Sequence, residues 1–292
     1  MSTGLPILET HDLAKRYGRH TWALTGIDLA IPQGGITALV GPNAAGKSTL
    51  IKTWVGFEPP TRGGVTVGGI DPWKDRSGVL ALVGYVPQSP ALYDSLSVND
   101  HLDLAVMLRP NFDRAYARRR LDELGIPGDR GARSLSGGQQ AQVALALALG
   151  TRARILLLDE PLASLDPLAR REFLHVLTDA VRSDGATALL SSHIVTDVEQ
   201  ACDRLVVLGV GRILLHDSVA EALASHLLAT DGAAATDSEA IGSFAGPAGE
   251  RLTLLRRPTA AQAVTNLRPA SLEEVVLGYL ASGRTSPAEA AA

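Results

Sequence analysis

The chain has 292 residues, 46% of them hydrophobic and 20% charged, as expected for a globular protein with a sizeable core. Its formal net charge of −4 and pI near 6.0 argue against an overall basic surface, so we expect no nucleic-acid partner. Cys202 is the single cysteine, which excludes an internal disulfide and a metal site built on paired cysteines.

No targeting or membrane-spanning segment is evident in the pattern of apolar residues. The first residues, MSTGLPILETHDL, lack a basic start followed by a long apolar stretch, so we expect no signal peptide. Uninterrupted apolar runs stay well below the roughly 18 residues that a transmembrane helix needs, so none is predicted.

Short apolar runs alternate with longer segments of helical periodicity, which predicts an α/β fold with a largely parallel sheet. In chain order, the predicted strands are residues 36–40, 65–67, 80–86, 155–158, 187–190 and 205–208. The predicted helices between them are residues 47–55, 98–108, 136–149 and 167–181. Ser97 directly precedes the second of these helices and is a good N-cap residue.

The composition changes after about residue 222. Residues 230–249 are rich in Gly, Ala, Ser and Asp and are predicted to form a flexible linker. Residues 251–255 alternate like a short strand, and Ser271 with Glu274 forms a capping box that opens a helix through Leu280. We therefore predict a main domain over residues 5–220 and a C-terminal extension over residues 221–292.

The segment after the first predicted strand matches the phosphate-binding pattern G-x4-G-K-[ST]. Such a loop curls its backbone N–H groups around a polyphosphate and leads into a helix N-terminus, which favours anions. Lys47 adds a positive charge for the β and γ phosphates, and the Ser48 hydroxyl is a ligand for Mg²⁺. The predicted nucleotide-binding residues are Gly41, Pro42, Asn43, Ala44, Ala45, Gly46, Lys47, Ser48 and Thr49.

Two carboxylates end the apolar run at residues 155–158 (ILLL). In open α/β sheets, ligands bind at the carboxyl ends of the strands. Asp159 is therefore predicted to hold Mg²⁺, through water, and Glu160 to polarise the water that attacks ATP. Taken alone, the pair would serve equally well as a helix N-cap, but its combination with the phosphate loop favours a nucleotide site.

Five motifs in this order resemble the ATP-binding subunit of an ABC transporter: GPNAAGKST, VPQSP, LSGGQ, ILLLDEP and SSH. Leu135, the first residue of LSGGQ, stands 20 residues before Ile155. The resemblance covers roughly residues 5–220. It implies a P-loop NTPase fold with a RecA-like core, an antiparallel β subdomain and an α-helical subdomain at about residues 89–150, here followed by a small α+β extension.

The resemblance also implies roles for individual residues. Tyr17 matches the aromatic residue that stacks on adenine. Gln88 matches the glutamine that contacts Mg²⁺ and water, Glu160 the catalytic base, and His193 the histidine near the γ-phosphate, with Lys47 as the fourth catalytic residue. The signature residues Ser136, Gly137, Gly138 and Gln139 would cap the ATP of a second subunit. The implied cofactors are ATP and Mg²⁺, with Ser48, Gln88 and Asp159 at the metal.

The implied assembly is a head-to-tail dimer, with a homodimer favoured over a heterodimer, that works with a separate transmembrane permease subunit. This would place the chain at the cytoplasmic face of the plasma membrane, held there by its partner. The ending SLEEVVLGYL (residues 271–280) is similar to that of ATPase subunits in the drug and antibiotic exporter branch, which favours export. The transported molecule is not encoded in this chain.

The sequence departs from the family pattern at three places. Ala44 stands where glycine is usual, and if this position requires a positive φ, alanine costs roughly 1 kcal/mol. After LSGGQ, where the family often has basic residues, the run is Gln140-Ala-Gln142, and Leu147 stands where arginine is frequent.

Two other classes of function remain open. One is a soluble ABC ATPase that is not coupled to transport, and the other is a nucleotide-gated binding subunit without turnover. The single phosphate loop argues against the two-cassette translation factors.

Overall fold

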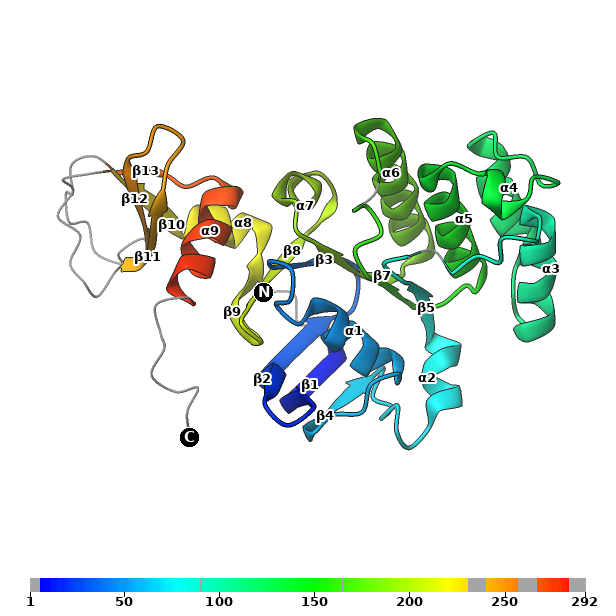
Figure 1. Ribbon diagram of the computed structural model, residues 1–292, viewed down its shortest axis with the longest axis horizontal. Coiled ribbons are helices and arrows are strands. Elements are labelled where there is room, and N and C mark those ends of the chain that lie inside the picture. Colours follow the sequence, from blue (N-terminus) through cyan, green and yellow to red (C-terminus); the bar gives the residue numbers. More distant parts are fainter. Residues whose placement is uncertain (1–5, 90, 164, 231–239, 257–266, 284–292) are drawn as a thin grey trace.

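The computed structural model describes residues 6–89, 91–163, 165–230, 240–256 and 267–283 (Figure 1). Within these ranges the chain builds a central six-stranded sheet, a three-stranded antiparallel sheet and a four-stranded antiparallel sheet. In Figure 1 the three-stranded sheet lies below the central sheet, the helices between residues 98 and 184 lie above and to the right of the central sheet, and the four-stranded sheet lies at the left end.

The central sheet has the strand order β5-β6-β7-β3-β8-β9 and is parallel except for β9. Every residue of β6 and β7 is buried, because packed layers cover both faces of the sheet. The strands predicted near residues 36, 155, 187 and 205 are confirmed. The strands are β3 (Gly35–Val40), β5 (Val83–Val86), β6 (Ile155–Leu158), β7 (Thr187–Ser192), β8 (Arg204–Gly209) and β9 (Arg212–Ser218).

The predicted strand at residues 80–86 is half wrong. Its first residues belong to helix α2 (Arg76–Leu82), and only Val83–Val86 form strand β5. The Asp75 side chain accepts a hydrogen bond from the Gly78 N–H and so caps the helix. A short apolar run does not by itself distinguish the end of a helix from a buried strand.

The three-stranded sheet has the order β2-β1-β4, and it consists of β1 (Pro6–Tyr17), β2 (Thr21–Pro32) and β4 (Arg62–Val67). Helix α1 (Lys47–Val55) lies between this sheet and the central one. Its side chains Leu50, Ile51 and Trp54 are buried in a core that both sheets share. The small sheet therefore fixes the helix that follows the phosphate loop.

Helices cover the opposite side of β5, β6 and β7, where α5 and α6 pack on the central sheet. The helices predicted at residues 98–108 and 136–149 are confirmed, and both begin with the capping box of a serine, Ser97 and Ser136. The helices of this part are α3 (Val98–Leu108), α4 (Arg114–Glu123), the 3-10 turn η1 (Ala132–Ser134), α5 (Gly137–Gly150), α6 (Pro167–Asp184) and α7 (Val195–Ala201).

The C-terminal part packs against the central sheet instead of standing apart from it. Val40 of β3 and Leu205 of β8 share a buried cluster with Leu254 and Val275 from the C-terminal part. The capping box of Ser271 opens α9 as predicted. The elements are α8 (Val219–Ala224), β10 (His226–Ala229), β11 (Ala240–Ala245), β12 (Arg251–Arg256), β13 (Leu267–Pro269) and α9 (Leu272–Ser282).

The prediction of a flexible linker over residues 230–249 is wrong for Ala240–Ala245, which form strand β11. This strand pairs with β12, and the Ser243 and Thr253 hydroxyls lie 2.9 Å apart across the pair. Pairing satisfies the backbone of a segment whose composition alone resembles a loop. Residues 231–239 of the predicted linker lie outside the described residues.

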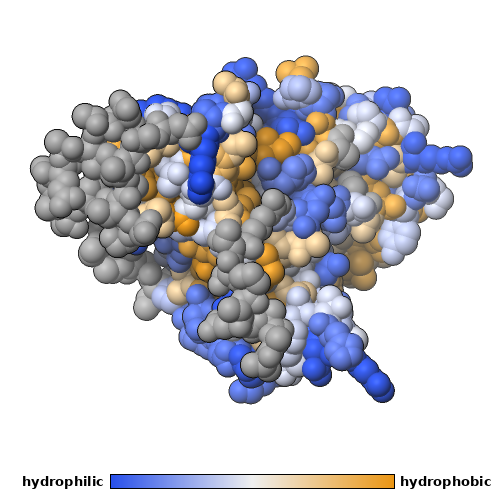
Figure 2. Space-filling view, turned by 60° about the vertical axis from the view of Figure 1, so that its left-hand side comes forward, coloured by the Kyte–Doolittle hydropathy of each residue, from blue (hydrophilic) through white to orange (hydrophobic). Residues whose placement is uncertain are grey.

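Within the described ranges, no helix combines the length and the apolar character that crossing a membrane requires. On the face shown in Figure 2, hydrophobic residues lie in separate patches among hydrophilic ones.

Candidate nucleotide site

The loop between β3 and α1 is held in a tight curve by backbone conformations that favour glycine. Gly46, directly before α1, has a φ of 108°, and a Cβ at this position would lie 2.5 Å from the Ala23 carbonyl oxygen. Ala44 is also in the left-handed region, with a φ of 64°. The condition under which alanine costs about 1 kcal/mol at this position is therefore met.

This loop lines a cavity of about 350 Å³. Residues 43–49 form one wall, and Gln88 and Glu160 form another. Residues 21–23, at the start of β2, complete the lining. The cavity lies at the N-terminus of α1, whose first N–H groups have no partner within the helix and are suited to bind anionic phosphates.

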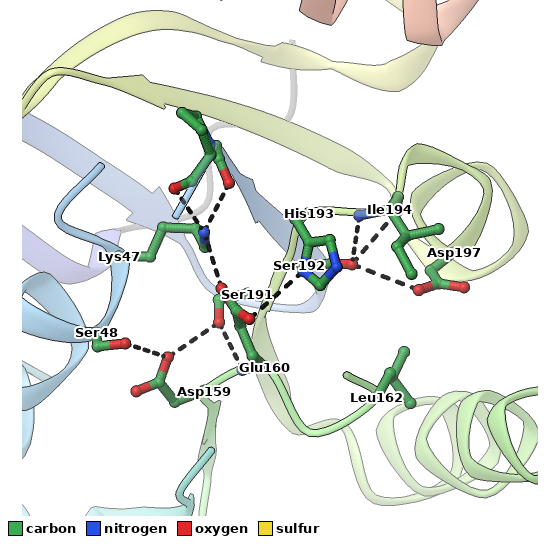
Figure 3. A network of polar contacts seen from close by, with 12 residues as sticks. Lys47, Ser48, Asp159, Glu160, Leu162, Ser191, Ser192, His193, Ile194 and Asp197 are labelled. Atoms are coloured by element: carbon green, nitrogen blue, oxygen red, sulfur yellow. Dashed lines mark hydrogen bonds and ion pairs between the residues drawn. The ribbon is translucent and has the colours of Figure 1, made fainter. Parts of the chain in front are cut away.

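Lys47 is a buried cation at the floor of this site, with 3% of its side chain exposed. Its Nζ lies 2.9 Å from Glu160 Oε1 and donates hydrogen bonds to the carbonyl oxygens of Gly41, at 2.6 Å, and Pro42, at 3.1 Å (Figure 3). The positive charge predicted for phosphate is therefore already paired. An entering phosphate must replace at least the Glu160 contact to bind this amine.

Asp159 connects the loop helix to the strands. The Ser48 hydroxyl donates to Asp159 Oδ1 at 3.0 Å, and the Ser191 hydroxyl donates to the same oxygen at 3.2 Å. Burial raises the pKa of Asp159 above its usual value of 3.8, and the two serine hydrogen bonds oppose this shift. A positive ion beside this carboxyl would favour its charged form.

Glu160 follows β6 and is buried, with a positive φ of 47°. Its backbone N–H donates to Ser191 Oγ at 2.7 Å, which fixes the turn that directs the carboxylate toward Lys47. Glu160 Oε2 lies 3.4 Å from Nδ1 of His193, whose side chain is 43% exposed. Figure 3 shows the three side chains in a row, Lys47, Glu160 and His193.

The serine before His193 holds the loop that presents the histidine. Ser192 Oγ accepts a hydrogen bond from the Ile194 N–H at 3.0 Å and lies 3.4 Å from Asp197 Oδ2. These contacts tie the end of β7 to α7 and set the place of His193 at the edge of the site.

Two further predicted residues occupy different positions relative to the cavity. Gln88, which is exposed, lines the cavity together with the phosphate loop. Tyr17 is 38% exposed, and its hydroxyl lies 3.4 Å from Thr49 Oγ1, but its ring is not part of the cavity lining. The structure therefore places Tyr17 beside Thr49 of α1, while the aromatic side chain that lines the cavity is that of Trp22.

The signature residues are not brought to this cavity. Ser136, exposed, is the N-cap of α5, where its Oγ accepts from the Gln139 N–H at 3.2 Å. The Gln139 side chain accepts from the Ser136 N–H at 3.1 Å and so completes the cap. The N-terminus of α5, which is suited to bind an anion, is therefore exposed, with Gly137 accessible beside Ser136.

The donor set around Ser48 fits Mg²⁺ with nucleotide phosphates. The Ser48 hydroxyl and the Asp159 carboxyl are in contact, and Gln88 lines the same cavity. These are the hard oxygen ligands that Mg²⁺ prefers. Among the described residues, no group of three or more His, Cys, Asp or Glu side chains is arranged to hold a metal ion.

Two residues of the site were missed by the sequence analysis, Ser191 and Trp22. Ser191 contacts both Asp159 and the Glu160 backbone. Ser191 is the first residue of the SSH motif and directly follows a predicted strand, and this position could have indicated that it belongs to the site. Trp22 lines the cavity, and it is 47% exposed. Its place across the β1–β2 hairpin from Arg16 would have indicated it, but β1 and β2 were not predicted individually.

Comparisons with known proteins agree on one family. The family model described as ABC transporter matches residues 24–163. The chain is 36% identical over 209 residues to the thiamine import ATP-binding protein ThiQ of Jannaschia sp. (strain CCS1), a match that covers 68% of this chain and 88% of that protein. It is 37% identical over 212 residues to the sulfate/thiosulfate import ATP-binding protein CysA 2 of Chromobacterium violaceum, covering 70% of this chain. That match spans 57% of CysA 2, just over half of its length.

The fold is also found in a solved structure described as the ATP binding subunit of an ABC transporter. The TM-score is 0.66 at 30% identity, and the match covers 74% of this chain and 91% of that one. The predicted fold class is therefore confirmed.

Proposed function

The chain belongs to the ABC transporter family as one of its ATPases, and on that premise we propose that it is the ATP-hydrolysing subunit of an exporter with separate transmembrane subunits. The observation that carries the proposal is the row of Lys47, Glu160 and His193 beside the phosphate loop. In this arrangement, the carboxylate that would orient water contacts both the cation that would bind phosphate and the histidine.

Each residue then has a chemical task. Lys47 exchanges its contact with Glu160 for the β and γ phosphates, which releases the Glu160 carboxylate. Glu160 orients the attacking water and accepts its proton, and His193 contacts the γ-phosphate and holds Glu160 from the other side. Ser48, Gln88 and Asp159 would hold Mg²⁺, which would neutralise charge on the phosphate oxygens. Tyr17 stacks on adenine.

A second ATPase subunit completes the site in this proposal. Ser136 and Gly137 are exposed at the N-terminus of α5 and are not part of the cavity that the phosphate loop lines. In a single chain the N-terminus of α5 therefore contributes nothing to the cavity beside the phosphate loop. Two copies arranged head to tail would place each signature segment, Ser136 to Gln139, over the other copy's ATP, and a homodimer needs only this one chain.

The partner in the membrane would dock on a groove of about 350 Å³ beside α3. The groove is mostly lined by apolar side chains, and Tyr93 and Leu108 at its edge are 62% and 72% exposed. Leu147 contributes to the lining where the family often has arginine, which makes this groove more apolar. An amphipathic helix of a permease matches such a surface. Docking there would hold the chain at the cytoplasmic face of the plasma membrane.

We propose that residues 5–220 form the cassette and residues 221–292 the extension that distinguishes this chain. The direction of transport rests on this extension, because its ending, at residues 271–280, resembles exporter subunits. A second candidate direction, import, is favoured by the names of the relatives ThiQ and CysA 2. The family match at residues 24–163 does not include the extension and so does not decide between the two.

The enzyme proposal is tested by phosphate release from Mg-ATP, with and without the membrane subunit. We expect Glu160→Gln to lower turnover by at least about 100-fold and to retain ATP binding. Glu172→Gln, an exposed carboxylate on α6, is the matched control and should behave as wild type. Wild type as inactive as Glu160→Gln, even with its partner, would favour the binding subunit without turnover.

The direction is tested in cells by comparing small-molecule content between wild type and Glu160→Gln. An exporter leaves its substrate accumulated in the variant cells, whereas an importer leaves it depleted. Unchanged content, together with full ATPase activity of the isolated wild-type chain, would favour the soluble ATPase that is not coupled to transport.

A further inference from the structure

Trp22 is an exposed aromatic side chain at the beginning of β2. It lies directly across the hairpin from Arg16, and the Arg16 guanidinium carbon lies 5.2 Å from the centre of the indole ring. This cation–π contact holds one face of the indole against the sheet. Even so, 47% of Trp22 remains exposed. The exposed part of the side chain is accessible to a ligand in the cavity that Trp22 lines.

The backbone beside Trp22 packs directly on the phosphate loop. A Cβ on Gly46 would lie 2.5 Å from the carbonyl oxygen of Ala23, so only glycine permits this close approach. Ala23 is the next residue after Trp22, and both line the cavity with the phosphate loop. The contact between β2 and Gly46 therefore fixes the place of the indole at the site.

The residues that line the cavity come from two sheets and differ in chemistry. Gln88 and Glu160 follow strands of the central sheet and, with Lys47, form a polar part suited to the γ-phosphate. Trp22 comes from the three-stranded sheet and forms an aromatic part. A nucleoside triphosphate has the same division, with anionic phosphates at one end and an aromatic base at the other.

Tyr17 is placed differently from Trp22. Its hydroxyl is directed to Thr49 Oγ1, 3.4 Å away, and the Lys15 amine lies 5.0 Å from the centre of its ring. Lys15 is itself held by an ion pair with Glu58 at 3.0 Å. Tyr17 therefore has partners for its hydroxyl and for one ring face, and it does not line the cavity.

We propose that Trp22 is a nucleoside-binding residue of this chain, whose indole contacts the base and ribose of a bound nucleoside triphosphate independently of Tyr17. The proposal rests on the proposed function, because it assumes that the loop binds the triphosphate. The ligand class is purine nucleoside triphosphates, whose two-ring base offers the larger stacking area. Stacking needs no hydrogen bond to a base edge, so GTP should bind through Trp22 as ATP does.

The test measures the dissociation constants of ATP and of inorganic tripolyphosphate by calorimetry on the full chain. Trp22→Ala should weaken ATP binding by about tenfold and leave tripolyphosphate binding within twofold of wild type. Trp22→Phe should recover most of the lost ATP affinity. The matched control is Trp73→Ala, since Trp73 is 42% exposed and lies outside the cavity lining.

Each outcome separates the inference from the function on which it rests. Unchanged ATP affinity in Trp22→Ala overturns the inference while the ATPase remains established. Equal weakening of ATP and tripolyphosphate also overturns it, since Trp22 then only supports the loop. A wild-type chain that binds neither ligand overturns the proposed function itself. If Trp22→Ala does not fold, Trp22→Leu, which keeps apolar bulk without an aromatic ring, replaces it in the same two titrations, and wild-type ATP affinity in that variant overturns the inference.

Discussion

Lys47 Nζ and Glu160 Oε1 lie 2.9 Å apart in a site where both side chains are more than nine-tenths buried. The cation that should bind phosphate and the carboxylate that should activate water thus neutralise each other in this conformation. Such a pair is costly to break from one side, because the remaining charge stays buried without its partner.

Lys47→Ala should therefore have two separable effects. ATP affinity should fall by at least about 100-fold, because the charge-assisted contacts to phosphate are lost. The free energy of unfolding should also fall by about 3 kcal/mol, because Glu160 loses its buried cation. The double variant Lys47→Ala, Glu160→Ala should recover most of this stability and none of the ATP affinity. Urea denaturation and calorimetry check both parts, and equal stability of the single and double variants would contradict the coupling.

Ala44→Gly should stabilise the loop. Ala44 has a φ of 64°, where an L-side chain costs roughly 1 kcal/mol, so glycine should raise the free energy of unfolding or the ATP affinity by about that amount. Ala45→Gly is the matched control. Ala45 is buried and does not have a positive φ, so glycine should destabilise there. Both variants are compared by thermal unfolding with and without ATP, and a loss of stability in Ala44→Gly would contradict the argument.

Asp159→Asn should raise stability in the absence of nucleotide, with a dependence on pH. The pKa of Asp159 is raised in the folded chain, mainly by burial, so the folded chain binds this proton more tightly than the unfolded chain does. Its contribution to stability is complete below the unfolded value of about 3.8 and is lost as the pH rises through the raised folded value. Asparagine should therefore raise the melting temperature near neutral pH and lose this advantage in acid.

The same variant should lose Mg-ATP hydrolysis, because the carboxylate is missing. Asp129→Asn, at an exposed position, is the control and should show neither effect. A melting temperature that rises equally at all pH values would show that the ionisation of Asp159 is not the cause.

Gln142→Met should stabilise the chain by about 1–2 kcal/mol. Gln142 is 4% exposed, and both polar atoms of its side chain lack a hydrogen-bond partner among the described residues. Methionine has a similar length and no such polar groups to leave unsatisfied. The control is Gln140→Met, because Gln140 Nε2 donates to the Ala132 carbonyl at 3.2 Å, and its loss should destabilise. Chemical denaturation of both variants checks the difference, and a destabilised Gln142→Met would point to an ordered water at the amide.

The sequence predicted elements best where a local signal determines the structure. The N-cap predicted at Ser97 and the capping box predicted at Ser271 are both present, because a cap is made by residues only three apart. Ser136 begins α5 with a capping box that was not predicted. The strands β1 and β2 were missed as individual elements, since their pairing is interrupted by irregularities near Thr10 and Leu13 that disturb the alternation.

The site was predictable as a set of residues but not as a set of contacts. Motif order named Lys47, Ser48, Asp159, Glu160 and His193, which the structure joins through polar contacts beside the phosphate loop. The roles assigned to them remain predictions. The Lys47–Glu160 pair could not be read from the motifs, because it joins the helix after β3 to the end of β6 through the folding of the central sheet.

The shared core between the central sheet and the C-terminal part has a practical consequence. Val40 of β3 leads directly into the phosphate loop and packs in the same cluster as Leu272 and Val275 of α9. A chain shortened after residue 220 would expose this apolar surface to water and would be prone to aggregate. Loss of activity in such a shortened protein would then report damage to β3, not a regulatory task of the missing residues, so point substitutions are the sounder way to study this part.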